Sequence, residues 1–397
     1  MTAGGKIWVS SLNASAAIRP GGRPPAPVRF YDTTLRDGEQ TVGVVLTPQQ
    51  KLELARALDD LGVARIEAGF PRVSPDDAEA FALIARAGLR AEVWGFARAA
   101  RGDIEELARL GARATVIEIP CSPIKMRAYG ISAEDALRRA EEAVRLARQN
   151  GMRVAFFPVD GTRAELGHLR ALYLRVLEAG AEELVVVDTI GACGPEAVES
   201  LVGQVHEWAG QAVPIHFHGH DDFGLATACA IAAVRAGASW IQATINGMGE
   251  RAGNADIAEV AMALKCLYGV PVELRLEKLR EVSARVRAAS GYSMEPWKAV
   301  TGENLFMRES GAVASQFHMP EAIEPFSAEL VQARRGIVLG KKSGLDSVEI
   351  KARELGLEIA AEKRPAVLAA VKRRGIEKRG LLSDQEFREI VAACISG

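Results

Sequence analysis

From residue 28 to residue 245 the chain alternates short apolar runs with longer segments of helical periodicity. The short runs, rich in Val, Ile and Phe, predict buried strands at residues 28–31, 64–70, 91–96, 114–119, 153–157, 183–187, 213–217 and 240–245. The segments between them predict helices, the clearest at residues 48–61, 75–87, 133–150, 164–179, 195–209 and 225–236. Glycines that favour the left-handed conformation of a helix C-cap follow several of these segments, at Gly62, Gly88, Gly151, Gly180 and Gly237.

Eight strand–helix units with nearly continuous apolar strands indicate a parallel sheet that is covered by helices. We therefore expect an α/β protein with a closed (β/α)8 TIM barrel over residues 28–290, because eight such units in about 260 residues match that fold. An open, doubly wound sheet is the alternative. In a barrel, the catalytic groups lie where the strands end and the following loops begin.

The pattern changes on both sides of the predicted barrel. Residues 1–27 are rich in Gly and Pro and predict a flexible tail, with one short extended piece at residues 7–10, rather than a signal peptide. Residues 291–397 predict a mostly helical region that is irregular up to residue 332, has a Gly-Lys-Lys-Ser-Gly turn at 340–344 and is strongly charged afterwards. We expect this region to act as a lid on the barrel or to pair two copies into a homodimer.

The composition narrows the class of protein. With 49 basic and 51 acidic residues, the formal net charge of −2 argues against binding to nucleic acid or to an anionic membrane. No apolar run reaches the ~18 residues that span a bilayer. The five cysteines are odd in number and form no CxxC pair, which favours a reducing cytoplasm. We expect a cytoplasmic protein that binds small molecules.

A first polar cluster follows the first predicted strand, over residues 32–40, Asp-Thr-Thr-Leu-Arg-Asp-Gly-Glu-Gln. It supplies carboxylates and a guanidinium where the chain leaves a buried strand, which is the position of an active site in a barrel. The alternative is a solvated turn with an ion pair between Arg36 and Asp37.

A second cluster lies at the end of the seventh predicted strand. Three of the six histidines of the chain fall at alternate positions, His216, His218 and His220. Alternate residues of a strand point to the same side, so these imidazoles can converge on a metal ion. A single histidine would favour an ordinary hydrogen-bonded polar residue instead, and the alternating triplet favours metal binding.

A third cluster, Asn-Gly-Met-Gly-Glu-Arg-Ala-Gly-Asn at residues 246–254, follows the eighth strand. Its glycines allow close approach of a ligand to the backbone, although glycines alone are weak evidence. The loops after strands seven and eight commonly bind phosphate in barrels, so the position of this cluster carries more weight than its composition.

The three clusters meet at one rim if the barrel closes, because strands one, seven and eight then become neighbours. Asp37, two of the three histidines and the amide oxygen of Asn246 form a mixed oxygen and nitrogen set. Such a set suits Zn²⁺, Mn²⁺, Co²⁺ or Fe²⁺ better than Mg²⁺. Arg36, next to Asp37, is a candidate to stabilise an oxyanion on a substrate carbonyl.

These motifs together resemble the metal-dependent Claisen-condensing enzymes of the 2-isopropylmalate synthase and homocitrate synthase family, whose superfamily also includes HMG-CoA lyase. The resemblance covers roughly residues 28–345. The segments that carry it are residues 32–40, Ile-Glu-Ala-Gly-Phe-Pro (66–71), Gly-Phe-Ala-Arg (95–98), Asp-Thr-Ile-Gly (188–191), His-Gly-His-Asp-Asp-Phe-Gly-Leu-Ala (218–226) and residues 246–254.

The resemblance implies a role for each matching residue. Asp37, His218 and His220 would bind a divalent metal (Mn²⁺, Zn²⁺, Co²⁺ or Mg²⁺), with Asn246 nearby or coordinating, and His216 would take no part. The implied catalytic residues are Arg36, which polarises the 2-oxo group, with Gln40 and Glu67. The implied substrate-binding residues are Arg98, Lys125, Phe157, Arg163 and Thr189, and those implied for acetyl-CoA are Asn246, Gly247, Gly249, Glu250 and Arg251.

The reaction implied by the resemblance is an acyl transfer. The enolate of acetyl-CoA would attack the 2-oxo carbon of a 2-oxo acid, and hydrolysis of the thioester would give a 2-substituted malate. Two alternatives remain: a metal-dependent carbon–carbon lyase or aldolase of the same superfamily, and a non-catalytic relative that only binds a metal and a carboxylate.

The chain departs from the family pattern where proton transfer is expected. Val159 stands where members usually have Glu, Lys125 where they have His, and Val313 where a C-terminal His is expected, with His318 as the nearest substitute. The pattern therefore leaves the general base unassigned. Ala155 and Phe157 replace polar residues that hold a second substrate carboxylate, and an apolar wall favours a less polar 2-oxo acid.

Overall fold

The structure, a computed structural model, describes residues 5–15 and 27–396, which fall into two compact units. One unit comprises residues 11–294, and the other joins residues 295–397 to the first ten residues of the chain. Most of the expected tail, residues 1–4 and 16–26, lies outside the described residues. Within the rest of it, Ile7 forms an antiparallel bridge with Phe326, and Ser11–Ala14 forms the 3₁₀ helix η1.

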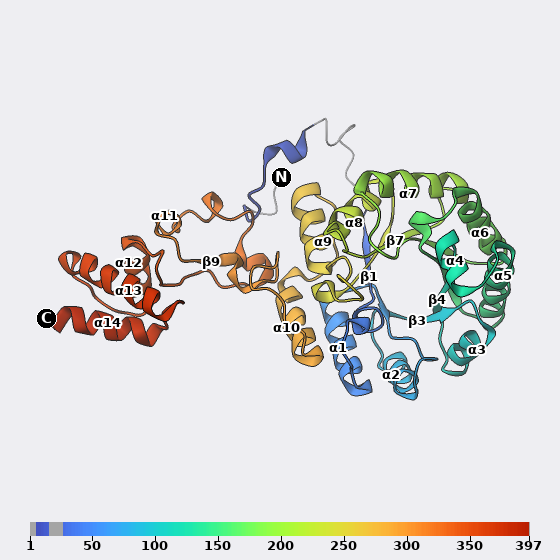
Figure 1. Cartoon of the computed structure of the whole chain (residues 1–397), viewed down its shortest axis with the longest axis horizontal. Helices are drawn as coiled ribbons and strands as arrows, with labels where there is room; N and C mark the ends of the chain where they lie inside the picture. The colour runs from blue at the N-terminus through green and yellow to red at the C-terminus, as the bar shows by residue number, and fades with distance from the viewer. Residues whose placement is uncertain (1–4, 16–26, 397) are drawn as a thin grey trace. The chain divides into compact units, whose positions relative to one another are not determined.

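Eight parallel strands close into a barrel in the larger unit (Figure 1). They are β1 (Arg29–Asp32), β2 (Arg65–Glu67), β3 (Glu92–Arg98), β4 (Ala114–Pro120), β5 (Arg153–Val159), β6 (Glu183–Asp188), β7 (Ile215–Gly219) and β8 (Trp240–Ala243). Strand β8 pairs with β1 in register, Phe30 opposite Ile241, so the sheet has no open edge. The predicted TIM barrel is confirmed, and the open sheet is excluded.

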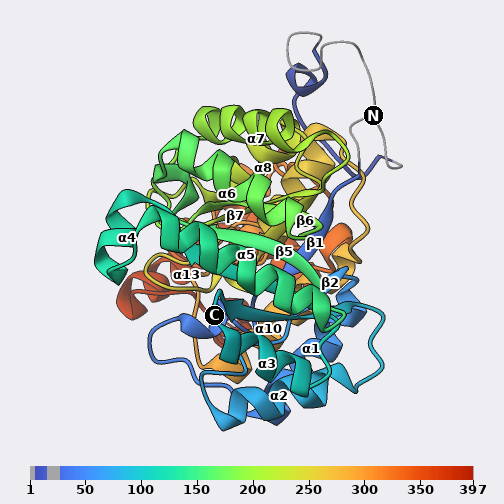
Figure 2. The same cartoon turned by 90° about the vertical axis from the view of Figure 1, so that its right-hand side faces the viewer.

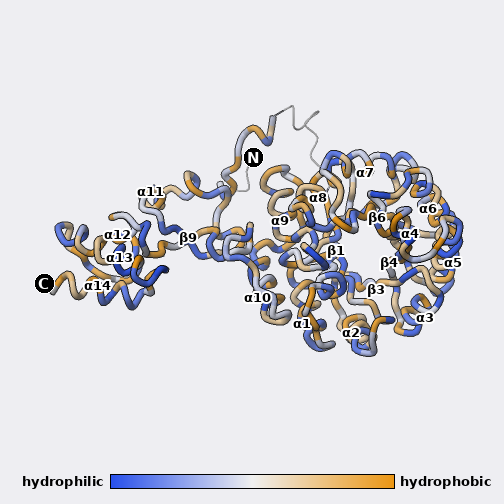
Figure 3. Tube along the Cα trace, in the orientation of Figure 1, coloured by the Kyte–Doolittle hydropathy of each residue, from blue (hydrophilic) through white to orange (hydrophobic). Residues whose placement is uncertain are grey.

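Helices surround the barrel, and Figure 2 shows α5 and α6 in front of the strands that they cover. Hydrophilic and hydrophobic positions alternate along these helices (Figure 3), as expected for helices with one face on the sheet. The helices of this unit are α1 (Pro48–Leu61), α2 (Pro75–Ala85), α3 (Arg101–Arg109), α4 (Pro123–Tyr129), α5 (Ala133–Gln149), α6 (Leu166–Glu178), α7 (Pro195–Ala209), α8 (Ala226–Arg235), α9 (Ile257–Ala263) and α10 (Leu279–Ser290). Single-turn segments are η2 (Gly38–Gln40), η3 (Gly161–Arg163), η4 (Ile245–Gly247), the π-helical η5 (Leu264–Tyr268) and η6 (Leu276–Lys278).

Helix α1 shows how local sequence fixes the loop that carries the first polar cluster. Thr47 caps the helix by accepting a hydrogen bond from the Gln50 backbone at 3.2 Å, and the Gln50 side chain accepts one from the Thr47 backbone at 2.9 Å. Lys51, buried on this helix, forms ion pairs with Glu39 and with Asp77. The loop after β1 is thereby tied to α1 and to the start of α2.

The amino-terminal half of the barrel interior contains a group of polar and aromatic side chains that we call the lower cluster: Arg65, Trp94, Glu183, His216 and Trp240. The Arg65 guanidinium lies between the two indole rings, 4.4 Å from Trp94 and 3.7 Å from Trp240, and donates two hydrogen bonds to Glu183 at 2.6 and 2.9 Å. His216 Nε2 lies 2.5 Å from the same carboxylate, and its ring stacks on Trp240. The polar atoms of the lower cluster therefore have partners within the protein, including Glu92 for Arg65 and Gln242 for His216.

The smaller unit is mostly helical, as predicted. Its elements are η7 (Glu303–Phe306), β9 (Met307–Arg308), α11 (Gly311–Ala314), η8 (Pro320–Ala322), η9 (Ala328–Val331), β10 (Gly336–Ile337), α12 (Leu345–Glu354), η10 (Ala361–Lys363), α13 (Arg364–Lys378) and α14 (Asp384–Ser396). Val348, Val367, Val371 and Phe387 from the three long helices form its apolar core with other buried side chains. Although strongly charged, this unit therefore has a core of its own.

Two further observations bear on the class of protein. None of the helices in the described part of the chain is long and apolar enough to cross a bilayer. All five cysteines are free thiols, and Cys121 and Cys229 are buried.

Candidate metal centre

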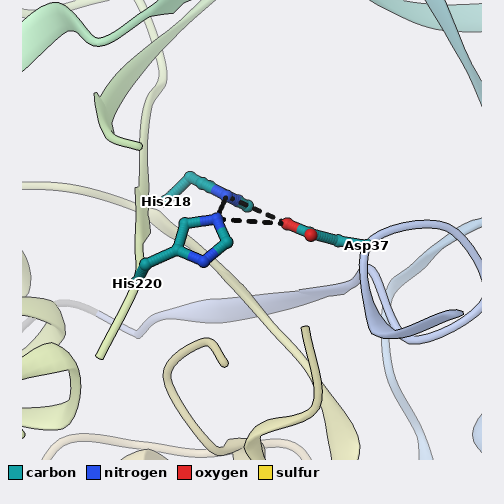
Figure 4. A group of neighbouring side chains, drawn as sticks. All are labelled: Asp37, His218 and His220. Atoms are coloured by element: carbon teal, nitrogen blue, oxygen red, sulfur yellow. Dashed lines mark hydrogen bonds and ion pairs between the residues drawn. The ribbon is translucent and has the colours of Figure 1, made fainter. Parts of the chain in front are cut away.

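Asp37, His218 and His220 converge at the carboxyl end of the barrel, and Figure 4 shows the carboxylate and both imidazoles pointing toward one another. Asp37 Oδ2 lies 3.2 Å from His218 Nε2 and 3.6 Å from His220 Nε2, and the two Nε2 atoms are 3.4 Å apart. All three side chains are buried. The structure thus brings together residues from opposite ends of the barrel sequence into one group, which we call the metal group.

The electrostatic state of the metal group suits a divalent cation. Burial raises the pKa of Asp37, but the Arg36 guanidinium and the imidazoles outweigh it and hold this pKa well below its usual range. Burial lowers the pKa of His220 to about 4, so its imidazole is neutral at neutral pH. Asp37 Oδ2 accepts no hydrogen bond despite being buried. A buried carboxylate oxygen without a hydrogen-bond donor, next to the ring nitrogens of two imidazoles, is a ligand set for a metal such as Zn²⁺ or Mn²⁺.

Local backbone structure places these three side chains. The backbone N–H groups of Arg36, Asp37 and Gly38 all donate to the carbonyl of Thr33, at 3.2, 2.9 and 3.1 Å, which makes a tight turn directly after β1. His218 lies on β7, and His220 follows it by two residues, so both point into the barrel. His216 precedes His218 by two residues on β7, so it points to the same side nearer the start of the strand, and it belongs to the lower cluster.

Arg36 is held firmly but keeps one free donor. Its Nε donates to Glu67 Oε2 at 2.6 Å, and its guanidinium lies 4.1 Å above the ring of Phe96. The other oxygen of Glu67 accepts a hydrogen bond from the Tyr31 hydroxyl at 3.0 Å. Nη1 lies 3.4 Å from Asp37 Oδ2, whereas Nη2 is buried without a partner. Glu67, fully buried, is therefore placed to orient Arg36, and Nη2 is available to a ligand.

Aromatic side chains line the barrel next to the metal group. The Phe157 ring lies 5.0 Å from the ring of His218, and it meets Phe96 edge to face at 5.7 Å. Phe96 contacts Phe70 in the same way at 5.6 Å. A ligand in this place meets an apolar wall.

The cations expected to bind substrate are mostly paired within the protein. Arg98 donates two hydrogen bonds to Asp103, at 2.8 and 3.0 Å. Arg163 donates two to Asp160, at 2.8 and 2.7 Å. Lys125 lies half-buried in the first turn of α4. Neither guanidinium is a free partner for a second substrate carboxylate.

The amide of Asn246 is engaged at both ends by one residue of α10. Its nitrogen donates to the Ser283 carbonyl at 3.2 Å, and its oxygen accepts from the Ser283 hydroxyl at 2.5 Å. Asn246 also has a left-handed backbone, with φ of 63°. The side chain is therefore fixed in the loop after β8 by contacts within the protein.

The glycines of this loop are required by its tight turn. A side chain at Gly253 would lie 2.0 Å from the Gly247 carbonyl oxygen, and one at Gly249 would meet a buried asparagine. Arg251 ties the loop to its neighbours by donating to the Thr189 carbonyl at 2.7 Å and to Asp222. Next to it, Glu250 is exposed.

Gln40 is exposed at the end of η2, and it lines a pocket of about 420 Å³ together with Arg36. The rest of the lining comes from the loops after β1 and β2, including Val45, Phe70 and Val73, and from the first turns of α1 and α2. The pocket offers room for a small molecule beside the donor of Arg36.

Sequence reasoning missed Glu118, which faces the barrel interior from β4. It lies opposite Arg98 of β3 and Phe157 of β5 in the strand register. Burial raises the pKa of its carboxyl to about 7, although Arg36 and Arg98 lower it. The signal was present in the sequence, because one charged residue interrupts the apolar run at residues 114–119.

Comparisons with known proteins place the chain in a family. Residues 27–286 match the HMGL-like family. The chain is 43% identical over 369 residues to homocitrate synthase AksA of Methanopyrus kandleri, covering 92% of both chains. It is 38% identical over 366 residues to (R)-citramalate synthase CimA of Methanocaldococcus jannaschii, covering 92% of this chain and 74% of that one.

The fold also has solved counterparts. Hydroxymethylglutaryl-CoA lyase from Pseudomonas aeruginosa superposes with a TM-score of 0.62 at 22% identity, covering 68% of this chain and 95% of that chain. At this identity the match concerns the barrel alone. The sequence matches, together with the barrel and the metal group, confirm the resemblance noted from the motifs. The chain belongs to the HMGL-like family, in the group of the citramalate, homocitrate and isopropylmalate synthases.

Proposed function

We propose that the protein is an acyltransferase that condenses acetyl-CoA with a 2-oxo acid to give a 2-substituted malate. The observation that carries this proposal is the buried metal group beside an Arg36 Nη2 that has no partner. The names of the relatives, homocitrate synthase and (R)-citramalate synthase, support the same class of reaction.

We assign the metal to Asp37, His218 and His220. When bound there, Mn²⁺, Zn²⁺, Co²⁺ or Mg²⁺ would act as a Lewis acid toward the oxygens of the 2-oxo acid. Arg36 Nη2 donates a hydrogen bond to the 2-oxo oxygen as negative charge develops on it. Glu67 and Tyr31 keep this guanidinium in place, and Gln40 borders the adjacent pocket.

The 2-oxo acid that fits best has an uncharged side chain. Phe157 and Phe96 form an apolar wall next to His218, and a second carboxylate there would be buried without a partner. Arg98 and Arg163 are already paired with Asp103 and Asp160. A short aliphatic 2-oxo acid therefore fits this wall better than 2-oxoglutarate.

We assign acetyl-CoA to the loop that follows β8. Backbone groups at Gly247 and Gly249 lie on this loop without side chains to obstruct a ligand, and Arg251 is exposed next to Glu250. Asn246 shapes the loop through Ser283. Thr189, bound by Arg251, and Lys125 of α4 would complete the surroundings of the substrates.

Release of free thiol from acetyl-CoA, measured with a panel of 2-oxo acids and each of Mn²⁺, Co²⁺, Zn²⁺ and Mg²⁺, tests the proposal. We expect release that depends on both the metal and an aliphatic 2-oxo acid. Cleavage of a 2-hydroxy acid or its CoA thioester, with no release in the panel, would instead establish the lyase or aldolase alternative. Metal binding without any turnover would establish the non-catalytic one.

We also propose that residues 291–397 pair two copies of the chain. Ile376, Leu381 and Ile395 are large apolar side chains of this unit that are about half exposed, at 55%, 47% and 49%. Multi-angle light scattering at micromolar concentration should give twice the chain mass of 42.5 kDa. A monomer mass would refute the pairing.

A further inference from the structure

Glu118 is a carboxylate on the inner face of the barrel, close to the metal group. It has the same orientation on β4 as Ala114 and Val116, which belong to the interior cluster. In the strand register it stands opposite Phe157, whose ring lies 5.0 Å from His218. Paired positions on neighbouring parallel strands are about 4.8 Å apart, so Glu118 lies one strand away from a residue in contact with a metal ligand.

The carboxylate of Glu118 is held by no other group. Within the described residues, no side chain or backbone N–H donates a hydrogen bond to it, and it forms no ion pair. The charged groups that face it are Arg36 from the loop after β1, Glu67 from β2, Arg98 from β3 and Asp103 from α3. From β5 it meets Phe157, which has no charge.

The other interior carboxylates near the metal group are engaged. Glu67 uses one oxygen for Tyr31 and the other for Arg36. Asp32 accepts two hydrogen bonds from Thr34, at 3.0 and 2.7 Å. Among these carboxylates, Glu118 is thus the one with both oxygens available. This matters because Val159 and Val313 stand at the two positions where relatives are expected to carry proton-transferring groups.

We propose that Glu118 is the proton-transferring carboxylate of this site, a role that rests on the proposed condensation. It accepts a proton from the acetyl methyl of acetyl-CoA, and the electron pair of that C–H bond forms the enolate. The enolate carbon bonds to the 2-oxo carbon, and the carbonyl π electrons become an alkoxide that takes the proton back from Glu118. Water then cleaves the thioester, so that the new carboxylic acid and the CoA thiol are released.

The protonation behaviour of Glu118 is consistent with this role. Burial raises its pKa to about 7, which outweighs the lowering by Arg36 and Arg98. A carboxylate with such a pKa is a stronger base than an exposed one, and about half of it is ionised at neutral pH. The ionised form is the active one, so kcat should fall as the pH drops below about 7.

Glu118→Gln tests the inference with the intact, metal-loaded protein. We expect kcat for thiol release to fall by about 10²–10⁴-fold, the KM for the 2-oxo acid to stay within about threefold, and the acid limb of the kcat profile to disappear. In D₂O, exchange of the acetyl methyl hydrogens should be lost as well. Glu118→Asp should keep the acid limb at a rate reduced by at least tenfold. Glu105→Gln, on the exposed side of α3, is the matched control and should behave as wild type.

The outcomes separate the inference from the proposed function. If wild type releases thiol and Glu118→Gln keeps the wild-type kcat and acid limb, Glu118 is not the base while the condensation stands. If wild type shows no release with any 2-oxo acid, the condensation is refuted and this role with it. If Glu118→Gln does not fold, Glu118→Asp decides. The Asp side chain is one methylene shorter, so its carboxylate is further from the substrate, and a wild-type rate in this variant overturns the role.

Discussion

The barrel contains two buried polar groups, built on the same strands, whose partners differ. Strand β7 supplies His216 to the lower cluster and His218 to the metal group, and β2 supplies Arg65 to the first and Glu67 to the surroundings of the second. In the lower cluster, the charged atoms of Arg65 and Glu183 have partners within the protein. In the metal group and next to it, Asp37 Oδ2 and Arg36 Nη2 are buried without one.

The difference teaches how to recognise a site among buried polar residues. Burying a polar atom without a partner costs about 1–3 kcal/mol, so an unpartnered oxygen and an unpartnered nitrogen side by side at the end of a barrel indicate that a ligand pairs with them. A fully paired cluster contributes stability and a fixed geometry. We therefore expect substitutions in the metal group to abolish metal binding and turnover while the protein stays folded. Substitutions in the lower cluster should instead lower the stability of the protein while the folded molecules still bind metal.

His218→Ala should have the largest effect. Removing one of three ligands should lower the metal content to background and reduce turnover by more than about a hundredfold, since even residues that only orient a ligand account for 10–100-fold. Elemental analysis after dialysis and thiol release measure the two effects. His168→Ala, on half-buried His168 of α6, is the control. Bound metal and turnover at the wild-type level would place the metal elsewhere.

Arg65→Ala should break the lower cluster instead. It leaves the buried Glu183 carboxylate without its guanidinium, and loss of one partner of a buried ion pair costs about 3–5 kcal/mol. Urea unfolding should show this loss, while the metal bound per folded molecule stays at the wild-type level. Arg138→Ala, which removes exposed pairs on α5, should cost less than about 1 kcal/mol. Equal losses for both variants would show that the lower cluster adds no stability.

The fold was predictable because it depends on periodicity, which a sequence displays directly. The bounds predicted for α1 and α7, residues 48–61 and 195–209, agree with the structure. Closure of the barrel follows from the number of strand–helix units, and it brings the loop after β1 beside the end of β7. The convergence of Asp37 with His218 and His220 could therefore be predicted without knowing any contact between side chains.

Pairings between side chains were not predictable in the same way. Arg98 and Arg163 were expected to face substrate, but each binds an aspartate a few residues further along or back, and only coordinates show which partner a guanidinium chooses. The engagement of Asn246 by Ser283 joins residues 37 positions apart. Glu118 lies within the apolar run at residues 114–119, and an apolar run predicts a buried strand without showing that its one charged side chain faces the interior.

Arg36→Lys tests the comparison within one side chain. The Nε atom of Arg36 is paired with Glu67, whereas its Nη2 atom is buried without a partner. The ammonium of Lys can replace one donor but cannot both bind Glu67 and present a second, free nitrogen. We expect kcat to fall by about 10²–10³-fold, as for loss of an oxyanion donor, with unchanged metal content. Arg101→Lys, exposed on α3, is the control. A wild-type kcat in Arg36→Lys would mean that the free Nη2 does not act on the reacting oxygen.

Ser283→Ala has the smallest expected effect. It decides whether Asn246 is a metal ligand or only fixes the loop after β8. The substitution removes the hydroxyl that donates to the Asn246 amide oxygen at 2.5 Å, deep in the loop after β8. If Asn246 only fixes this loop, the buried oxygen loses its donor and the protein loses about 1–3 kcal/mol of stability, with unchanged metal affinity. If Asn246 is a metal ligand, Ser283 orients it, and metal affinity should fall by about 10–100-fold.

We expect the first result, because both ends of the Asn246 amide are already engaged by Ser283, as the side chains of the lower cluster are by one another. Urea unfolding of the metal-free protein and titration with Zn²⁺ measure the two quantities separately. Ser315→Ala, an exposed serine that bonds to the backbone of its own helical turn, controls for loss of a hydroxyl. A weakened Zn²⁺ affinity without loss of stability would move Asn246 into the metal group, and the ligand set would then contain four side chains, drawn from β7 and from the loops after β1, β7 and β8.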